Sequence, residues 1–407
     1  MEPRYIPRAL EPVLERAARQ FPAVVLTGPR QSGKTTLLKR VFGGAARYVS
    51  LEPPDVREAA TVDPRGFLAS VPTPVIFDEI QYVPNLLPYI KEQIDERRSE
   101  AGQFLLTGSQ NLLLASRVSE SLAGRAAMLR LLPLSNREAR GHPHAPLPWD
   151  PASRSPARVT PGSVDLWENV VRGWYPELAA APHRDIALWH SSYTQTYVER
   201  DVRSLRQIGD PTSFQSFLRA LAARNGQLLS LSGLSRDLGI AVNTVKAWLA
   251  VLEASFQILV LRPYHANVGK RLVKTPKVYF TDTGTVCHLA GLRDPLHAAS
   301  GPMGGSLMET VVLMEVVKTL VNRGEEAAVY FWRTSAGSEV DIVVEHGGQL
   351  VPIEVKLSST ARPAMANEIR AFQSEFGKKA AAGYVVHPGD TRLPLAARVT
   401  ALPFGEL

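Results

Sequence analysis

A complete phosphate-binding signature lies near the N-terminus, where residues 28–35 read GPRQSGKT and fit the pattern GxxxxGKT. Glycines let the backbone N–H groups of such a loop surround phosphate oxygens, and the helix that follows adds a favourable dipole. We expect Lys34 to reach the β- and γ-phosphates and the Thr35 hydroxyl to bind Mg²⁺. A simple glycine turn is the alternative, and Lys-Thr at this register argues against it. The residues expected to bind ATP are Gly28, Pro29, Arg30, Gln31, Ser32, Gly33, Lys34, Thr35 and Thr36.

Two acids follow an apolar run further along the chain, where residues 74–79 read PVIFDE. Carboxylates at the carboxyl end of a strand face the phosphate loop in an open α/β sheet. We expect Asp78 to position Mg²⁺ through water and Glu79 to orient or polarise the attacking water. Two acids after a buried strand can also cap the next element, but together with the loop they indicate an NTPase site.

Further residues are candidates for completing this site. Thr107 and Ser109 follow the apolar run QFLL, where a polar side chain could sense the γ-phosphate. Arg125, in the sequence SLAGR, could stabilise charge in a neighbour's site, although a lone arginine is more often solvated or structural. Arg4 and Arg8 flank the sequence YIP and could contact the nucleotide base.

Residues 231–252 have the pattern of a helix-turn-helix. A short helix-like run ends at Gly239, and a second run begins with Asn243 as its expected N-cap. Apolar residues at helical spacing should form the shared core, namely Leu234, Leu238, Val245, Leu249 and Leu252.

The strand-like runs FQILVL and KVYF follow and enclose the basic segment NVGKRLVKTPK, which is the layout of a winged helix. Such a wing would contact phosphates without regard to sequence, and the positive excess of the chain could lie there, between Lys270 and Lys277. The expected DNA contacts are Asn243, Thr244 and Lys246 on the second helix and Lys270, Arg271 and Lys274 on the wing. The alternative is a packing or protein-interaction module, because only one lysine is evident on the second helix.

Near the C-terminus, acidic residues lie on segments that could bring them together. Glu309 lies in the helix-like run SLMETVVLMEVVKTL, and Asp341 lies in the strand-like run EVDIVVEH. Glu354 and Lys356 end the run LVPIEVKL, and their spacing places both on one strand face. These carboxylates could hold Mg²⁺ while Lys356 orients or activates water against a phosphodiester. Short acids on exposed strands are also ordinary solvated residues.

Short apolar runs alternate with helix-like runs over residues 1–140, and this alternation predicts an α/β fold with a parallel sheet. Residues 141–163 are rich in proline, serine and arginine, and we expect a linker or surface loop. A helical region (164–224), the winged helix (225–284) and, after a glycine-rich break, a C-terminal α/β domain (300–407) should follow.

The composition limits the possible protein classes. The 407 residues are 45% hydrophobic, which is ample for two to four domains of about 100–200 residues each. The single cysteine, Cys287, excludes an internal disulfide and a cysteine-cluster zinc site and fits a reducing cytoplasm. No apolar run approaches the roughly 20 residues of a membrane span, and the opening MEPRYIPRALEP lacks the apolar core of a signal peptide. We therefore expect a cytoplasmic protein without a membrane partner. The net charge of +7 permits a polyanionic partner without indicating one.

The order of the motifs resembles a widespread prokaryotic family of AAA-type ATPases. It runs from the phosphate loop through FDEIQ, LTGS, SLAGR, RGWYPE and TYVERDV to the helix-turn-helix, GKRLVKTPK and a C-terminal domain. In that family the C-terminal region is a domain of unknown function related to PD-(D/E)XK nucleases. The resemblance implies ATP and Mg²⁺ as cofactors, and self-association either as a hexameric ring or as a monomeric switch. It matches Lys34, Thr35, Asp78 and Glu79 to the ATPase core and Glu309, Asp341, Glu354 and Lys356 to the nuclease signature.

Three functions are consistent with this reading. The first is an ATP-driven motor or remodeller on duplex or branched DNA, such as a Holliday junction, with a nuclease-like domain that binds more readily than it cuts. The second is a nucleotide-dependent regulatory switch that binds a protein partner. The third, a remodeller of peptides or proteins, ranks last because no substrate-recognition domain is evident.

Overall fold

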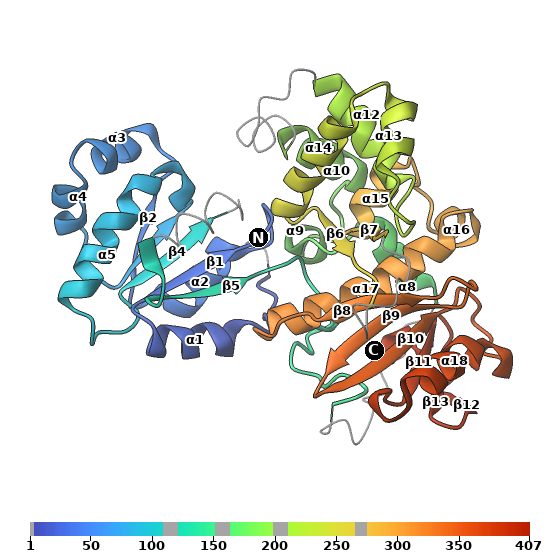
Figure 1. The fold of residues 1–407 in the computed structure, drawn as a ribbon. Helices are drawn as coiled ribbons and strands as arrows, with labels where there is room; N and C mark the ends of the chain where they lie inside the picture. The colour runs from blue at the N-terminus through green and yellow to red at the C-terminus, as the bar shows by residue number, and fades with distance from the viewer. Residues whose placement is uncertain (1–3, 109–120, 151–162, 198–210, 265–274) are drawn as a thin grey trace.

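The computed structural model describes residues 4–108, 121–150, 163–197, 211–264 and 275–407. An N-terminal part built on a parallel sheet stands beside a second body, which contains a helical middle region and a C-terminal mixed sheet (Figure 1).

The N-terminal sheet has five parallel strands in the order β2-β3-β4-β1-β5. Its strands are β1 (Ala23–Thr27), β2 (Arg47–Ser50), β3 (Val75–Asp78), β4 (Phe104–Gly108) and β5 (Ala126–Arg130). Every residue of β1, β3 and β4 is buried, as expected for central strands that are covered on both faces. The predicted α/β fold is confirmed, and the carboxyl ends of these three strands lie next to one another.

Helices cover both faces of this sheet, and each face has its own apolar core. Side chains alternate along the strands, so that Ile76 and Leu105 join one cluster and Phe77 and Leu106 join the other. The first cluster also holds α1 and α2, and the second holds α3, α4 and α5. The helices are α1 (Glu11–Gln20), α2 (Lys34–Phe42), α3 (Pro54–Val62), α4 (Pro64–Ser70) and α5 (Leu87–Glu96).

The middle region is mostly helical and contains the predicted helix-turn-helix. Its helices α13 and α14 meet at Gly239, whose left-handed backbone (φ 66°) ends α13 and suits glycine. The antiparallel pair β6 and β7 follows, as a winged helix requires. The elements from the end of the first sheet onward are α7 (Asn136–Ala139), α8 (Ser163–Arg172), α9 (Pro176–Ala180), α10 (Ile186–Tyr197), α12 (Pro211–Ala222), α13 (Leu231–Leu238), α14 (Val242–Ala254), β6 (Ile258–Leu261), β7 (Lys277–Phe280), α15 (Thr283–Leu289) and α16 (Pro295–Ser300).

The C-terminal domain packs a long helix, α17, and a shorter one, α18, against a mixed six-stranded sheet in the order β12-β13-β11-β10-β9-β8. Strands β8, β9 and β10 form an antiparallel meander, whereas β10, β11 and β13 run parallel. The elements are α17 (Gly304–Asn322), β8 (Val329–Arg333), β9 (Glu339–His346), β10 (Gln349–Val355), α18 (Asn367–Phe376), β11 (Gly383–His387), β12 (Leu393–Ala396) and β13 (Val399–Pro403).

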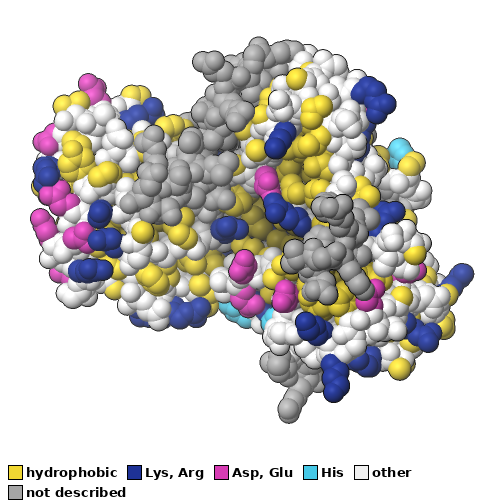
Figure 2. Space-filling model, in the orientation of Figure 1, with side chains coloured by type: hydrophobic (Ala, Val, Ile, Leu, Met, Phe, Trp, Pro, Cys, Tyr) yellow, Lys and Arg dark blue, Asp and Glu magenta, His cyan; other side chains and the backbone are white. Residues whose placement is uncertain are grey.

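The middle region and the C-terminal domain share one continuous apolar core. Phe214 and Trp248 of the middle region belong to the same cluster as Val312 of α17 and Ile342 of β9. The N-terminal sheet has separate clusters, and a groove of about 770 Å³ runs between β5 and the helices α14 and α17. Apolar side chains gather in the hollow between the two bodies (Figure 2). We therefore expect the middle and C-terminal parts to move as one body relative to the sheet.

The proline-rich segment packs against the second body over residues 141–150. Leu147 is fully buried in the shared core, and Trp149 packs on Tyr384 with ring centroids 5.9 Å apart. Asp150 pairs with Arg323 at 3.0 Å. Residues 141–150 contain no helix or strand, as expected of a loop, but a few apolar and charged side chains anchor the segment to the second body. Residues 151–162 lie outside the described residues.

Candidate nucleotide site

The phosphate loop connects β1 to α2, and its backbone conformation requires glycine at two positions. Gly28 has φ 153°, and a Cβ there would lie 2.1 Å from the carbonyl oxygen of Leu131. Gly33 is left-handed (φ 92°) and directly precedes α2. Ser32 is fully buried, and its hydroxyl oxygen has no hydrogen-bond partner among the described residues. A loop of this shape presents N–H groups and an unused hydroxyl, which fits a phosphate ligand.

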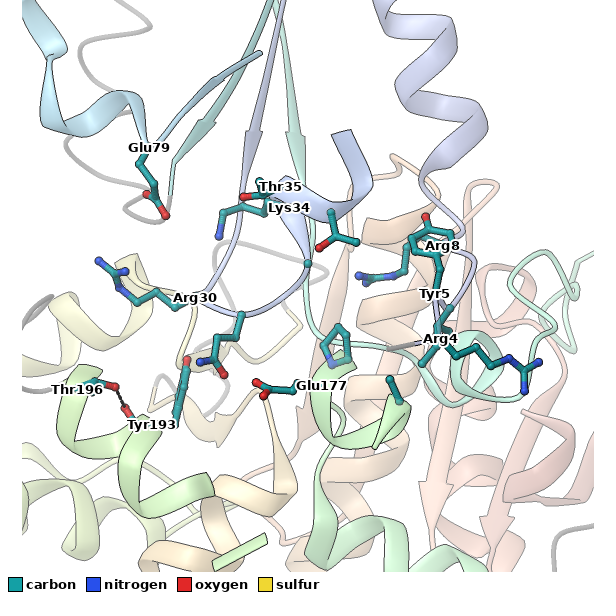
Figure 3. A pocket seen from close by; sticks show the side chains of 16 residues that line it. Arg4, Tyr5, Arg8, Arg30, Lys34, Thr35, Glu79, Glu177, Tyr193 and Thr196 are labelled. Atoms are coloured by element: carbon teal, nitrogen blue, oxygen red, sulfur yellow. Dashed lines mark hydrogen bonds between the residues drawn. The ribbon is translucent and has the colours of Figure 1, made fainter. Parts of the chain in front are cut away.

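Lys34 is the first residue of α2 and is held inside the loop. Its side chain is buried, and Nζ donates hydrogen bonds to the carbonyl oxygens of Gly28 (3.0 Å) and Pro29 (2.8 Å). The ammonium group thus stays at the mouth of the loop, beside the cavity that Figure 3 shows. The phosphate-loop signature predicts that the Lys34 ammonium group meets the β- and γ-phosphates at this position.

Asp78, at the end of β3, is the acceptor for three hydroxyl groups. The Thr35 hydroxyl donates to Oδ1 at 2.9 Å, the Tyr48 hydroxyl donates to Oδ2 at 2.9 Å, and the Thr107 hydroxyl also donates to Oδ1. Partial burial, followed by the hydrogen bond to Asp78 and its charge, raises the pKa of Tyr48 to about 12, so this donor stays protonated at neutral pH. The adjacent Thr35 hydroxyl and Asp78 carboxylate are the hard oxygen ligands that Mg²⁺ prefers.

Glu79 follows in a left-handed backbone conformation (φ 60°, ψ 49°) that non-glycine residues rarely adopt. Its backbone N–H donates to the Thr107 hydroxyl at 3.0 Å, and its carboxylate accepts a hydrogen bond from Gln81. The bend turns Glu79 into the lining of the cavity (Figure 3). Asp78 stays hydrogen-bonded to Thr35. Thr107 therefore contacts the Asp78 carboxylate and the Glu79 backbone, and it lies at the position predicted for a sensor of the γ-phosphate. The other predicted sensor, Ser109, lies outside the described residues.

A cavity of about 580 Å³ opens at the loop, within the usual range for small-molecule sites. One wall comes from the loop and Glu79, a second from the N-terminal segment, and a third from α9 and α10 of the middle region (Figure 3). The residues of the last two walls are Arg4, Tyr5, Ile6, Arg8, Pro176, Glu177, Ala180, Tyr193 and Thr196. The cavity and its lining fit a nucleotide with Mg²⁺.

The third wall was not predicted. Glu177 accepts a hydrogen bond from Trp189 Nε1 (2.9 Å) and pairs with Arg184 (2.6 Å), which holds it at the cavity. Tyr193 is fixed by hydrogen bonds to Tyr175 and Gln257, both 2.9 Å. The motif RGWYPE contains Tyr175 and Glu177, but nothing in the sequence places it beside a loop that lies far away along the chain.

Arg8 supports the loop, which differs from its expected contact with a base. It is buried and donates to the carbonyl oxygens of Ser32 (2.8 Å) and Leu132 (2.7 Å) and to the carboxylate of Glu138 (3.1 Å). Glu138 also accepts from Asn322, the last residue of α17, at 2.8 Å. A continuous polar network therefore joins the phosphate loop to the long helix of the C-terminal domain. Arg4 lines the cavity, as a base contact requires.

We expect Glu138→Ala to lower the free energy of unfolding by about 3–5 kcal/mol, because it leaves the buried Arg8 guanidinium without its carboxylate. Urea and thermal unfolding would measure this loss. Glu92→Ala is the matched control, because its pair with Arg65 (2.8 Å) is exposed and screened by solvent, so its loss should have a much smaller effect. Equal losses in the two variants would contradict the supporting role of Arg8.

Arg125 binds Asp95 of α5 through two hydrogen bonds, at 2.7 and 3.0 Å. It is absent from the lining of the cavity in its own chain. A role in a neighbour's site stays a prediction, and it would require this ion pair to open.

The helix-turn-helix residues lie at the exposed start of α14. Asn243 and Lys246 are exposed, and Thr244 is half-buried. The N-cap is Ala241, which makes no side-chain cap hydrogen bond, so the prediction of Asn243 as the N-cap is wrong. The helix begins two residues earlier because the chain turns directly after Gly239. Lys270, Arg271 and Lys274 lie outside the described residues.

The C-terminal acids do not form a metal site in the structure. Among the described residues, no three His, Cys, Asp or Glu side chains are placed to hold one metal ion. Glu309 pairs with Lys277 at 2.9 Å, and Glu354 pairs with Lys356 at 2.6 Å. The expected convergence on a divalent cation is therefore not observed. Lys277 begins β7, as the strand-like run KVYF predicts, and is buried in an ion pair. In the part of the chain that is described, no helix combines the length and apolar character that crossing a membrane would need.

Comparison with known proteins gives the following matches. Residues 20–140 match an AAA domain, and residues 163–296 and 304–407 match two domains of unknown function, DUF8612 and DUF4143. The chain is 32% identical over 399 residues to the uncharacterized protein Rv2008c of Mycobacterium tuberculosis and to the uncharacterized protein Mb2031c of Mycobacterium bovis, covering 97% of this chain and 82% of each relative.

Two solved structures are also similar, both at 16% identity. The Walker-type ATPase PABY2304 of Pyrococcus abyssi aligns over 69% of this chain and 94% of its own, with a TM-score of 0.43. The Holliday junction branch migration motor RuvB of Thermotoga maritima aligns over 62% of this chain and 86% of its own, with a TM-score of 0.27.

Proposed function

This chain belongs to the same family as the two mycobacterial proteins and carries an AAA domain, and from that premise we propose that it is an ATP-hydrolysing protein whose middle region responds to the bound nucleotide. The observation that carries the proposal is the composition of the cavity. The phosphate loop and Glu79 face Glu177 and Tyr193, so one ligand would touch both bodies of the molecule.

The residues of the site have separable roles in hydrolysis. Lys34 neutralises the β- and γ-phosphates, while Thr35 and Asp78 hold Mg²⁺. Glu79 orients a water molecule toward the γ-phosphate and accepts its proton. Thr107 fixes the positions of the two acids through its hydrogen bonds to the Asp78 carboxylate and the Glu79 N–H. ATP, when bound, supplies the phosphoanhydride bond that is cleaved.

Nucleotide binding would affect the second body, which contains the middle region and the C-terminal domain, through two sets of contacts. Contacts to α9 and α10 act on the middle region directly, and the network of Arg8, Glu138 and Asn322 acts on α17. Because the middle region and the C-terminal domain share one core, a shift in either contact would move both together.

We propose duplex or branched DNA as the substrate on which this cycle acts, with the protein working as a motor or remodeller. The support is the helix-turn-helix, whose second helix begins with the exposed residues Asn243 and Lys246. In this proposal the C-terminal domain, which resembles nucleases only in the order of its sequence motifs, binds DNA rather than cutting it.

A nucleotide-dependent switch with a protein partner is the second candidate. One observation favours it, because the same start of α14 exposes 43% of Val242, an apolar side chain that suits a protein surface better than a phosphate backbone.

The rate of ATP hydrolysis across a panel of DNA structures separates these candidates. If DNA is the substrate, we expect duplex or four-way junction DNA to raise the rate severalfold at low salt, and Lys246→Ala to weaken this stimulation. Glu253→Ala, on the far end of the same helix, is the control. Unchanged turnover with every DNA, together with a particle mass that changes between ATP and ADP, would favour the switch. The mass also distinguishes a ring from a monomer.

A further inference from the structure

The carboxylate of Asp282 joins two parts of the middle region that lie far apart in the sequence. Asp282 is buried between β7 and α15, and its Oδ2 caps α15 by accepting hydrogen bonds from the N–H (2.9 Å) and the hydroxyl (3.2 Å) of Thr285. Its other oxygen, Oδ1, accepts a hydrogen bond from the backbone N–H of Trp174 at 2.6 Å. Trp174 lies in the turn between α8 and α9, residues 173–175, so one carboxylate holds this turn against the start of α15.

Two glycines allow the turn and α15 to pack backbone against backbone. Gly173 has a left-handed backbone (φ 85°), and a Cβ there would lie 2.6 Å from Asp282 Oδ2. A Cβ at Gly284 would lie 2.7 Å from both the carbonyl oxygen of Arg172 and the Cα of Gly173. The position of the turn is therefore set by direct contact with α15 and by the hydrogen bond to Asp282.

The same turn leads directly to the nucleotide cavity. Pro176 and Glu177 begin α9 and line the cavity (Figure 3). Pro176 lies against the phosphate loop, because a Cβ at Gly33 would lie 3.7 Å from Pro176 Cγ. The carbonyl oxygen of Trp174 also accepts a hydrogen bond from the N–H of Leu134 at 2.8 Å, beyond the end of β5. The turn thus fixes how far the start of α9 lies from the phosphate loop.

The chain around Asp282 is also bonded to the helix-turn-helix. The preceding residue, Thr281, donates its hydroxyl to the carbonyl oxygen of Phe256 at 2.7 Å and its N–H to that of Gln257 at 3.0 Å. Phe256 and Gln257 follow the end of α14, and the Gln257 side chain donates to the hydroxyl of Tyr193 in the cavity wall. Asp282 therefore lies between α14 and the wall that faces the phosphate loop.

A buried lysine of the C-terminal domain supplies positive charge near Asp282. Lys318 of α17 is 1% exposed, and its Nζ lies 5.8 Å from the centroid of the Trp174 ring. Burial lowers the pKa of Lys318 to about 8, while the charge of Asp282, followed by that of Glu315, opposes this fall. The ammonium form therefore predominates at neutral pH, and α17 contributes a counter-charge to the carboxylate that holds the turn.

We propose that Asp282 is a positioning residue for the nucleotide site, which holds Pro176 and Glu177 beside the phosphate loop and thereby sets how tightly the nucleotide is bound. Asp282 does not line the cavity and acts through the N–H of Trp174. The groups assigned to hydrolysis lie on the N-terminal sheet, so loosening the turn should weaken nucleotide binding and leave the chemical step nearly unchanged. The inference rests on the proposed ATP-hydrolysing function and adds a contact through which α14 acts on the bound nucleotide.

Asp282→Asn tests this role, because an amide has a single oxygen and cannot accept hydrogen bonds from both Trp174 and Thr285 as the carboxylate does. We expect the KM for ATP and the dissociation rate of fluorescently labelled ADP to rise about tenfold, as for the loss of one hydrogen bond to a charged group. The value of kcat should change by less than about twofold, since binding of substrate and transition state is weakened equally. Steady-state hydrolysis and stopped-flow fluorescence measure these constants.

Asp294→Asn is the matched control. Asp294 is the exposed N-cap of α16 and accepts a hydrogen bond from the N–H of His297 at 2.7 Å, so the same change is made at another helix cap of the middle region. Its KM and ADP dissociation rate should equal those of the wild type. Thr285→Val is a second, milder variant that removes only the hydroxyl donor to Asp282, and it should raise both constants by about threefold. It tests the proposal if Asp282→Asn does not fold, as judged by circular dichroism.

Two results would overturn the proposal. One is a folded variant with an unchanged KM and an unchanged ADP dissociation rate. The other is a lower kcat at an unchanged KM, which reports a smaller folded fraction and a merely structural role for Asp282. A wild type that binds nucleotide without hydrolysing it would refute the proposed function alone, because the dissociation rates would still test Asp282. A wild type that binds no nucleotide would overturn both.

Discussion

Replacement of Lys34 by alanine is expected to lower the rate of ATP hydrolysis by about 10²- to 10³-fold, the effect of removing one well-placed charge donor from a transition state. The ammonium is buried at the mouth of the loop and is held there by the carbonyl groups of Gly28 and Pro29, in the position expected for contact with the phosphates. A coupled assay of phosphate release at saturating ATP measures the rate, and fluorescence of a labelled nucleotide measures the affinity.

Arg16→Ala is the control for this experiment. Arg16 is an exposed cation on α1 of the same domain and is absent from the lining of the cavity, so its removal should leave turnover close to that of the wild type. Hydrolysis that persists in Lys34→Ala would remove the assignment of the nucleotide site, whatever the partner of the protein.

Glu79→Gln is expected to separate binding from hydrolysis. The substitution keeps the shape of the side chain and the backbone bond to Thr107 but removes the carboxylate that accepts a proton from water. Turnover should fall by about 10²- to 10⁴-fold, as for loss of a general base, while ATP remains bound. Mixing with radiolabelled ATP and following both bound ATP and released phosphate would resolve the two effects.

Glu58→Gln supplies the matched comparison, since Glu58 is an exposed acid on α3 of the same domain. The role of Glu79 would be disproved by a variant that hydrolyses ATP normally. Loss of ATP binding together with hydrolysis would instead assign Glu79 to the structure of the loop.

The core of the nucleotide site was predictable because its chemistry is local. Eight consecutive residues contain the loop, and Asp78 and Glu79 end a run whose apolar character predicts a central strand. In a parallel sheet the carboxyl ends of strands meet at one edge, so loop and acids must lie together. Thr107 follows from the same rule, and the structure places it between the two acids.

Tyr48 follows from no such rule. It lies on the edge strand β2, and only the pairing of β2 with β3 brings its hydroxyl to Asp78. Arg8 was expected to meet a base, yet three acceptors of the protein take its guanidinium, one of them on a helix far along the chain. A guanidinium group has several N–H donors and can bind either a ligand or backbone carbonyl groups. The neighbouring residues in the sequence do not indicate which of these it contacts.

By itself, the sequence determined the elements, the α/β character of the N-terminal part and the loop-and-acid pair, because these depend on spacing along one strand or one turn of chain. The tertiary structure alone decided what faces them. It placed Glu177 and Tyr193 across the cavity from the loop and brought Lys277, the first residue of β7, against the carboxylates of Glu309 and Glu339. The reason is physical: a charged side chain is stabilised by whichever opposite charges the packed domains bring within a few ångströms, and that proximity is a property of the assembled cores rather than of neighbouring residues.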